Sequence, residues 1–236
     1  MVAQLARVCA VAVGEVGVSG AGVTVMGSVR DGLAGGRSLI YASNDLGQLL
    51  EDLQLTTGEG PCLEAFGSGT PVLMGDLDRD GDRWPAFTPE ATAIGTAAVF
   101  SFPLHVGAAR LGTMDLHRSA IGPLRATAVA DALLLARAAT ELLLQHLAPA
   151  TGSEPTDSGL TDSGLTDSGR AAPGWLSDVH AVVHQATGMI SEAHRVPVTE
   201  ALIRLRAQAF SRGIPISDVA RAVLANDIDL ARDHDQ

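Results

Sequence analysis

Arginine side chains gather near the C-terminal end of the sequence, where they could bind phosphate groups. The segment 194–224 contains five arginines and only two acidic residues. Its net charge is therefore positive, although the whole chain has a formal net charge of −11. The planar guanidinium donates two hydrogen bonds side by side and stacks on bases, which suits phosphates and RNA loops. We therefore predict phosphate or base contacts from Arg204, Arg206, Arg212 and Arg221. The alternative is that these arginines form solvated helix faces.

Other groupings of reactive residues each lack a required member. Four aspartates between residues 76 and 82 imitate the start of a calcium loop, but Phe87 stands where the loop needs a bidentate glutamate. His180 and His184 have the spacing of a helical metal pair without a third ligand nearby. The chain contains no lysine, which excludes a P-loop lysine and a Schiff-base lysine. We expect no catalytic residue, no metal and no cofactor, and hence a protein that is not an enzyme.

The two cysteines, Cys9 and Cys62, are too few for a disulfide framework or a zinc site. Cys62 follows Pro61, which favours the first turn of a helix. At a helix N-terminus the pKa of its thiol could be lowered, as in a redox sensor. The alternative is a small, inert core residue.

A repetitive segment divides the sequence. Residues 156–169 repeat a TDSGL-like unit, and prolines flank the repeat on both sides. Such a composition cannot bury enough apolar surface to offset the ordering of the backbone. We predict a sensor domain at 1–148, a disordered linker at 149–173 and a small helical output domain at 174–230.

The first 148 residues alternate strand and helix patterns. A helix is predicted around 45–53, and strands are predicted at 21–29, 37–42, 70–74, 97–106 and 110–118. Residues 107–109 give the last two strands a hairpin connection. Antiparallel neighbours interrupted by helices predict an α+β fold with a sheet flanked by helices.

The strongest helix pattern of this half spans residues 123–147 and carries two apolar rows. Because both rows must be buried, one can cover the sheet while the other pairs with a second subunit. The alternative is a helix buried wholly within one chain. The charges of Asp131, Arg137 and Glu141 argue against a membrane span.

Residues 175–230 are predicted to form a bundle of three short helices. The first keeps an apolar row through Val183, Ala186 and Ile190. Gly213 and Pro215 end the second helix, and Ser217 or Asp218 could cap the third.

Two parts of the sequence resemble known domain families. Residues 42–118 resemble GAF domains through LQLTTGEGPCLEAF (53–66), TPVLMGDL (70–77) and FPLHVGAARLGTMDLHR (102–118). Residues 175–230 resemble ANTAR domains through VHQATGMI (183–190), EALIRLRAQAF (200–210) and ISDVARAVL (216–224).

The resemblance implies a regulator of transcription antitermination. Such a protein would bind hairpin leader RNA through a three-helix domain, as a homodimer, under the control of a GAF-like antiparallel sheet domain that can take a small-molecule ligand. The ligand-binding residues stay unknown. The family signature implies packing roles for a set of residues in the helical part, namely Ala186, Gly188, Met189, Ala201, Val219 and Ala220.

Three features depart from the ANTAR pattern. Thr187 stands where many members have lysine, Pro197 replaces the usual cap of the second helix, and acidic residues follow position 226. RNA binding is therefore expected to be weak, dimer-dependent and salt-sensitive. We expect a cytoplasmic location and no membrane partner. The rival hypotheses are a protein–protein signalling module with a degenerate RNA-binding domain, and a helical DNA-binding domain.

Overall fold

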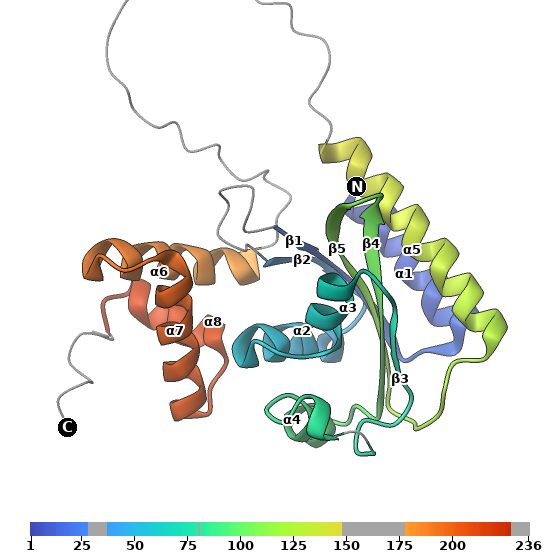
Figure 1. Cartoon of the computed structure of the whole chain (residues 1–236), viewed down its shortest axis with the longest axis horizontal. Coiled ribbons are helices and arrows are strands. Elements are labelled where there is room, and N and C mark those ends of the chain that lie inside the picture. Colours follow the sequence, from blue (N-terminus) through green and yellow to red (C-terminus); the bar gives the residue numbers. More distant parts are fainter. Residues whose placement is uncertain (28–36, 80, 148–177, 228–236) are drawn as a thin grey trace, which may run out of the picture.

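The computed structural model describes residues 1–27, 37–79, 81–147 and 178–227. In these parts the chain forms a five-stranded sheet with helices on both faces, the N-terminal domain, and beside it a bundle of three helices, the C-terminal bundle (Figure 1). The predicted linker at 149–173 lies outside the described residues, so its boundaries remain a prediction.

Every neighbouring pair of strands in the sheet is antiparallel, in the order β2-β1-β5-β4-β3. The strands are β1 (Gly20–Met26), β2 (Arg37–Ala42), β3 (Val72–Met74), β4 (Ala98–Val106) and β5 (Ala109–Arg118). β4 and β5 form the predicted hairpin, although its turn is one residue shorter because Ala109 already pairs with Val106. The α+β prediction is confirmed.

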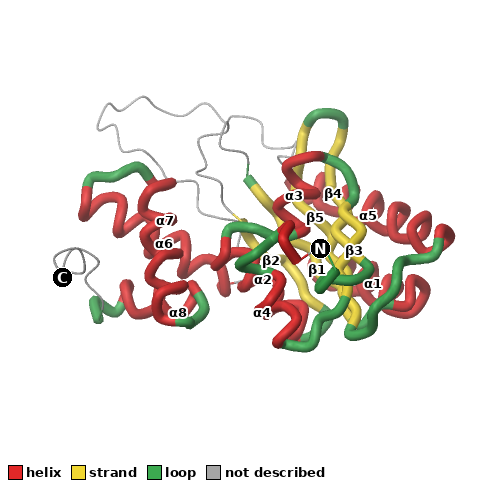
Figure 2. The backbone as a smooth tube through the Cα atoms, turned by 60° about the horizontal axis from the view of Figure 1, so that its bottom comes forward, coloured by secondary structure: helices red, strands yellow, loops and turns green. Residues whose placement is uncertain are grey.

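Helices cover both faces of this sheet (Figures 1 and 2). They are α1 (Val2–Val11), the π-helical turn η1 (Ala12–Gly17), α2 (Asp45–Thr57), α3 (Pro61–Ser68), the short 3-10 turn η3 (Gly81–Arg83), α4 (Thr88–Ala93) and α5 (Ala126–Leu147). One hydrophobic core joins α1, η1 and α5 to one face, and a second joins α2, α3 and α4 to the other. The sequence reasoning missed α1 and α4.

Helix α5 buries one side and exposes the other. Ala132, Ala139 and Leu143 are fully buried against the sheet side, whereas Leu133 and Leu134 are 45% and 66% exposed. One side of α5 covers the sheet, as expected, but its buried residues come from both predicted rows, so neither row is buried as a whole. The alternative of a helix buried wholly within one chain is wrong. Among the described residues, no helix is long and apolar enough to cross a membrane.

The C-terminal bundle consists of α6 (Asp178–His194), α7 (Val198–Arg212) and α8 (Ile216–Leu224). Its core gathers the predicted apolar rows of all three helices. Gly213 ends α7 in the left-handed conformation, as predicted. The predicted cap of α8 is wrong: α8 begins at Ile216, directly after Pro215, and Ser217 is buried inside the helix.

Candidate sensor core and nucleic-acid interface

Helix α2 places polar side chains against the sheet. Asn44 caps its start, because the Asn44 side-chain oxygen accepts a hydrogen bond from the Gly47 amide at 2.9 Å. Glu51 and Gln54, about one turn apart, both point inward and are 2% exposed. Around them lies a buried polar cluster, which we define as Thr24, Arg37, Glu51, Gln54, Ser101, Thr113 and Asp115.

An ion pair between Arg37 and Glu51 forms the centre of this cluster. The Arg37 Nη2 donates to Glu51 Oε2, which also accepts a hydrogen bond from Thr24 Oγ1 at 2.8 Å. Gln54 donates weakly to the other carboxylate oxygen at 3.4 Å, and its own oxygen accepts from the Cys62 amide at 2.9 Å. The pair is thus held by β1, β2 and α2 together, with both side chains nearly inaccessible to solvent.

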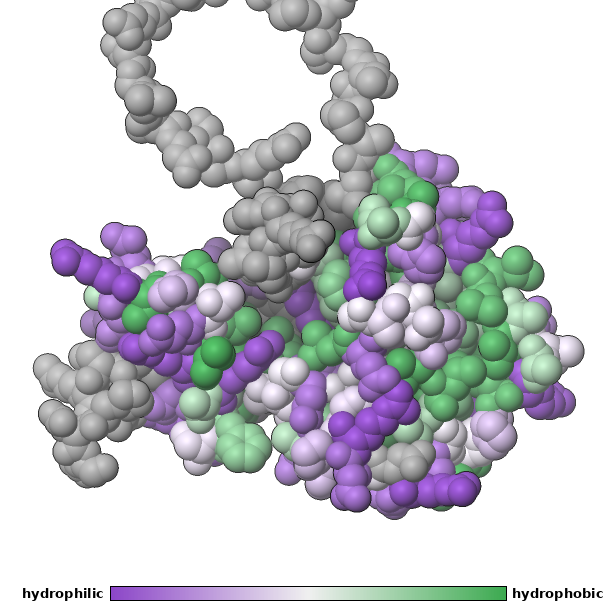
Figure 3. All heavy atoms as spheres, in the orientation of Figure 1, coloured by the Kyte–Doolittle hydropathy of each residue, from purple (hydrophilic) through white to green (hydrophobic). Residues whose placement is uncertain are grey.

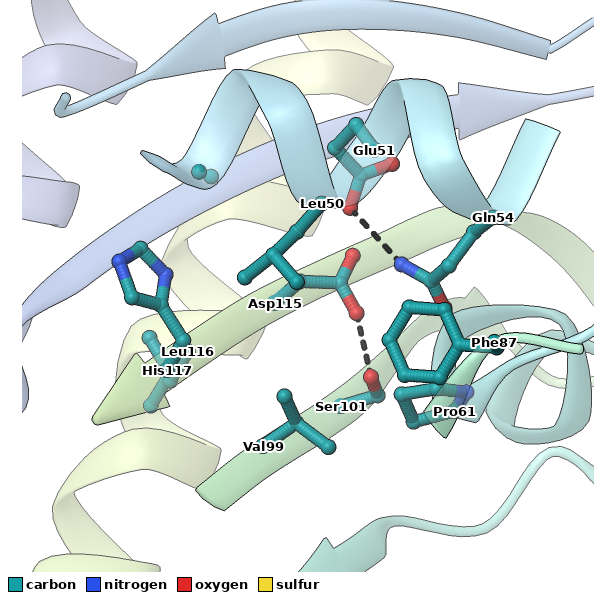
Figure 4. Close-up of a pocket in the computed structure, with 12 residues that line it drawn as sticks. Leu50, Glu51, Gln54, Pro61, Phe87, Val99, Ser101, Asp115, Leu116 and His117 are labelled. Carbon is teal, nitrogen blue, oxygen red and sulfur yellow. Dashed lines mark hydrogen bonds between the residues drawn. The ribbon is translucent and has the colours of Figure 1, made fainter. Parts of the chain in front are cut away.

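Asp115 faces this pair from β5. The hydroxyls of Ser101 and Thr113 donate to its two carboxylate oxygens, and Figure 4 shows the bond from Ser101. Burial, and then the negative charge of Glu51, raise the pKa of Asp115 to about 8. Asp115 is therefore mostly protonated at neutral pH, and the charges of Arg37 and Glu51 balance each other.

Arg37 of this cluster and the neighbouring His117 contain unpaired polar atoms. Among the described residues, Arg37 Nε and Nη1 and His117 Nε2 are buried without a hydrogen-bond partner. Burial lowers the pKa of His117 to about 4, so its ring is neutral at neutral pH. Groups of this kind are costly in a folded protein unless another state or a bound molecule satisfies them.

The cavity beside the cluster is small. Its volume is about 20 Å³, and its walls include Glu51, Gln54, Ser101, Asp115 and His117. A cavity of this size holds about one water molecule. The cavity also borders Asp115, which explains why part of this side chain stays accessible while protein surrounds the rest. An organic ligand would require α2 to move away from the sheet.

Cys62 belongs to the core and not to a reactive site. Its side chain is fully buried, and burial raises the pKa of its thiol well above the usual value. The redox-sensor interpretation is therefore wrong and the alternative of a core residue is confirmed. Donor atoms of Cys62, Glu51 and Asp115 lie within 4.8 Å of one another. A cation does not fit this trio, because Arg37 already supplies the positive charge beside Glu51.

Three of the four predicted RNA-binding arginines lie at the surface of the C-terminal bundle with local partners. Arg204 donates to Glu200 at 2.6 Å, and Arg221 forms an ion pair with Asp218. Arg212 donates to the side-chain oxygen of Gln208 at 3.1 Å. Ion pairs near the surface contribute little to stability, so a phosphate can replace the carboxylate beside Arg204 or Arg221.

Arg206 is placed differently, at the contact between the C-terminal bundle and α2. Its Nε donates to the carbonyl oxygen of Leu55 at 2.9 Å. Burial, and then the nearby Arg37 guanidinium, lower the pKa of Arg206. The four arginines therefore do not form one free basic patch in this conformation.

The residues of the family signature divide into two groups. Ala186, Ala201, Val219 and Ala220 are fully buried, which confirms their packing role. Gly188 and Met189 are exposed, so for them the packing expectation is wrong.

Thr187, at the position where many ANTAR members have lysine, is buried and donates to the Val183 carbonyl at 2.6 Å. This hydroxyl is occupied inside the helix. It therefore does not replace the missing phosphate contact.

Sequence reasoning missed Arg37, Glu51 and Asp115. One signal was available for the last two: Glu51 and Gln54 share the face of a helix with Leu50 and Leu55, and Asp115 interrupts an apolar strand. A carboxylate on an apolar face needs a partner if it is buried. Nothing in the sequence identifies Arg37 as that partner, because it comes from another strand.

Comparison with known proteins adds a family for the C-terminal bundle. Residues 178–224 match the ANTAR domain family. The chain thus carries an ANTAR domain, as its resemblance implied. No curated protein matches the chain.

Solved structures resemble the N-terminal domain at low sequence identity. One is a domain of a putative two-component sensor histidine kinase protein from Sinorhizobium meliloti 1021 (15% identity, 59% of this chain and 88% of that chain covered, TM-score 0.48). Another is the GAF domain of cyanobacteriochrome TePixJ (14% identity, 61% and 89% covered, TM-score 0.47). A third is the GAF domain from a phosphoenolpyruvate-protein phosphotransferase of Coxiella burnetii (16% identity, 61% and 84% covered, TM-score 0.45).

Proposed function

We propose that this protein is a signal-responsive regulator that binds structured RNA through its C-terminal bundle and promotes transcription antitermination. The observation that carries the proposal is the match of residues 178–224 to the ANTAR domain family. Arg204, Arg212 and Arg221 support it, because they are surface guanidiniums whose weak local partners a phosphate can replace. Hairpin leader transcripts are the proposed ligands, and Arg206 is the proposed fourth contact.

A homodimer is part of this proposal. A single small bundle neutralises only a few phosphates, so two linked copies gain affinity by binding two hairpins at once. The exposed leucines of α5, Leu133, Leu134 and Leu144, offer the surface for a second copy. Figure 3 shows hydrophobic surface on the side of the molecule where α1 and α5 lie.

The N-terminal domain is the proposed sensor. Its buried polar cluster contains unpaired groups and a carboxyl that is protonated at neutral pH, so the energy of this core depends on its chemical state. Opening α2 would let a small polar molecule reach Arg37 and His117.

A titration of the full chain with paired-hairpin RNA, measured by filter binding at several salt concentrations, tests the function. We expect affinity to fall steeply with salt and to exceed that for duplex DNA at equal salt. The variants Arg204→Ala and Arg221→Ala should each weaken binding and reduce the salt slope by about one. Arg83→Ala is the matched control, because it also removes one arginine from an exposed ion pair, but in the N-terminal domain and away from α5. Salt-independent or absent RNA binding would contradict the proposal, and a preference for duplex DNA would favour a DNA-binding domain.

The alternative is a protein–protein signalling module with a degenerate RNA-binding domain. One observation favours it: Arg204 and Arg221 both pair with carboxylates of their own helices. Under this alternative, both alanine variants leave RNA binding unchanged while a protein partner co-purifies with the full chain in the absence of RNA.

A further inference from the structure

Hydrogen bonds between described residues join the C-terminal bundle to the N-terminal domain at three places. Arg206 Nε donates to the Leu55 carbonyl at 2.9 Å, and the Ile216 amide donates to Thr56 Oγ1 at 3.2 Å. His184 Nε2 donates to the Arg37 carbonyl at 2.9 Å. The contact thus connects α6, α7 and α8 to the last turn of α2 and to the start of β2.

An apolar contact accompanies these bonds. Leu55 is 3% exposed and belongs to the hydrophobic core of the C-terminal bundle, where it joins Leu205, Ile216 and Val219. Leu50, just over one turn earlier on α2, packs instead into the core of the N-terminal domain. The end of α2 therefore serves two cores.

Arg206 acts as a cap for α2. The last carbonyls of a helix have no partner within it and carry partial negative charge, which a guanidinium stabilises. Gly58 ends α2 in the left-handed conformation, with φ +74°. The guanidinium lies so close to this residue that a Cβ there would be 3.1 Å from Arg206 Nη1. While the Arg206 guanidinium holds this position, it is not available to bind a phosphate.

We infer that the C-terminal end of α2 is an intramolecular docking surface that competes with RNA for Arg206. This inference rests on the proposed function, since it takes RNA as the competing ligand. In the docked state Arg206 contacts Leu55 and is half-buried. RNA binding through all four arginines requires this contact to open.

The docking contact is limited in extent, which makes it reversible. Beside it runs an open groove of about 360 Å³ between α2, α4 and the α7–α8 turn. Phe210 and Ile214 line this groove and stay 69% and 37% exposed. The two domains therefore touch along the end of α2 and the start of β2, and leave neighbouring apolar surface uncovered.

The buried polar cluster is connected to this docking surface through Arg37. The Arg37 side chain pairs with Glu51, and its carbonyl accepts the bond from His184. Its positive charge also acts on Arg206. A change in the cluster that moves Arg37 away from Glu51 therefore also disturbs the bond from His184 and weakens docking.

Hydrogen exchange of the full chain tests docking without reference to RNA. The Ile216 amide is the reporter, because its partner is a hydroxyl of the other domain. The double variant Leu55→Ala/His184→Ala removes docking contacts and no proposed RNA contact, so the Ile216 amide should lose protection. Leu73→Ala/His146→Ala is the matched control, because it removes the same residue types from exposed positions on β3 and α5. This control should keep the protection of the unaltered protein.

RNA titrations of the same proteins test the competition. The undocked variant should bind paired-hairpin RNA more tightly, within the roughly 5- to 150-fold range of intramolecular coupling, and the control should not. Saturating RNA should remove the protection of Ile216 in the unaltered protein. Glu51→Gln, which keeps the shape of the side chain, should shift both readouts in the same direction.

Two results overturn the inference and can be told apart. If the variant loses Ile216 protection but binds RNA with unchanged affinity, the competition is refuted while the proposed function stands. If none of the proteins binds RNA, the proposed function fails and takes the competition with it, whatever the exchange data show about docking.

Discussion

The N-terminal domain and the C-terminal bundle differ in the side chains that they bury. The N-terminal domain buries the charged side chains of Arg37 and Glu51 and the carboxyl of Asp115 between α2 and the sheet. The described core of the C-terminal bundle is apolar apart from Thr187 and Ser217, and its charged side chains lie outside. A charged core changes its energy when a proton or ligand arrives, whereas an apolar core does not. The proposed sensing role therefore falls to the N-terminal domain, where the buried charges lie.

The largest effect that tests this comparison is expected from Arg37→Ala. Removing one partner leaves Glu51 buried without its counter-charge, which costs about 3–5 kcal/mol of folding free energy. Chemical denaturation of the full chain measures the loss. Arg137→Ala breaks an exposed ion pair on α5 and should change the free energy of unfolding little. Equal, small losses for both variants would mean that the cluster is solvated, and the contrast between the cores would disappear.

A cavity made in the apolar core of the C-terminal bundle is expected to lower the free energy of unfolding by a similar or slightly smaller amount. Leu205→Ala should destabilise the C-terminal bundle by about 2–5 kcal/mol, because Leu205 is fully buried there. Hydrogen exchange should show lost protection in α6, α7 and α8 while β1, β4 and β5 keep theirs. If protection falls equally in the sheet, the two cores unfold together and are not separate regions.

The smallest effect concerns pH. The pKa of Asp115 is about 8 when folded, above the ordinary value of 3.8, so the folded protein binds the proton more tightly. Its contribution to stability is complete below about pH 4 and is lost as the pH rises to 8. His117 works in the opposite direction between about pH 4 and 6.5, so the interval from 6.5 to 8 isolates Asp115.

In that interval the free energy of unfolding should fall by at most about 1.4 kcal/mol per pH unit, as measured by urea denaturation. Asp115→Asn should abolish the slope, since the amide keeps the shape and cannot ionise. A slope that persists in this variant would assign the titration to another group. The C-terminal bundle should show no such slope.

Local patterns predicted most of the elements, because their causes are local. The hairpin of β4 and β5, the boundaries of β2 and the end of α7 at Gly213 all follow from residues within a few positions. Helix α4 was missed because six residues are too few to show a helical period. Helix α1 buries only Leu5 and Cys9, so its apolar stripe is narrow.

The candidate sites could not be predicted in the same way. Asp115 looks like a solvent-facing strand residue until Glu51 from α2 is placed opposite it. Arg204 and Arg206 both lie on α7, two residues apart. Arg206 caps α2, whereas Arg204 pairs with Glu200. Tertiary contacts decide which of these two arginines binds the other domain. The sequence of α7 does not indicate those contacts.

Because Leu55 belongs to the core of the C-terminal bundle, a fragment that contains the bundle alone lacks one of its core residues. A fragment that starts at residue 178 leaves this leucine behind and exposes an apolar hollow shaped to receive it. Such a fragment should self-associate more readily than the whole protein, because a second copy can cover the exposed apolar surface. Self-association of the excised piece would then report the missing leucine and not the natural assembly.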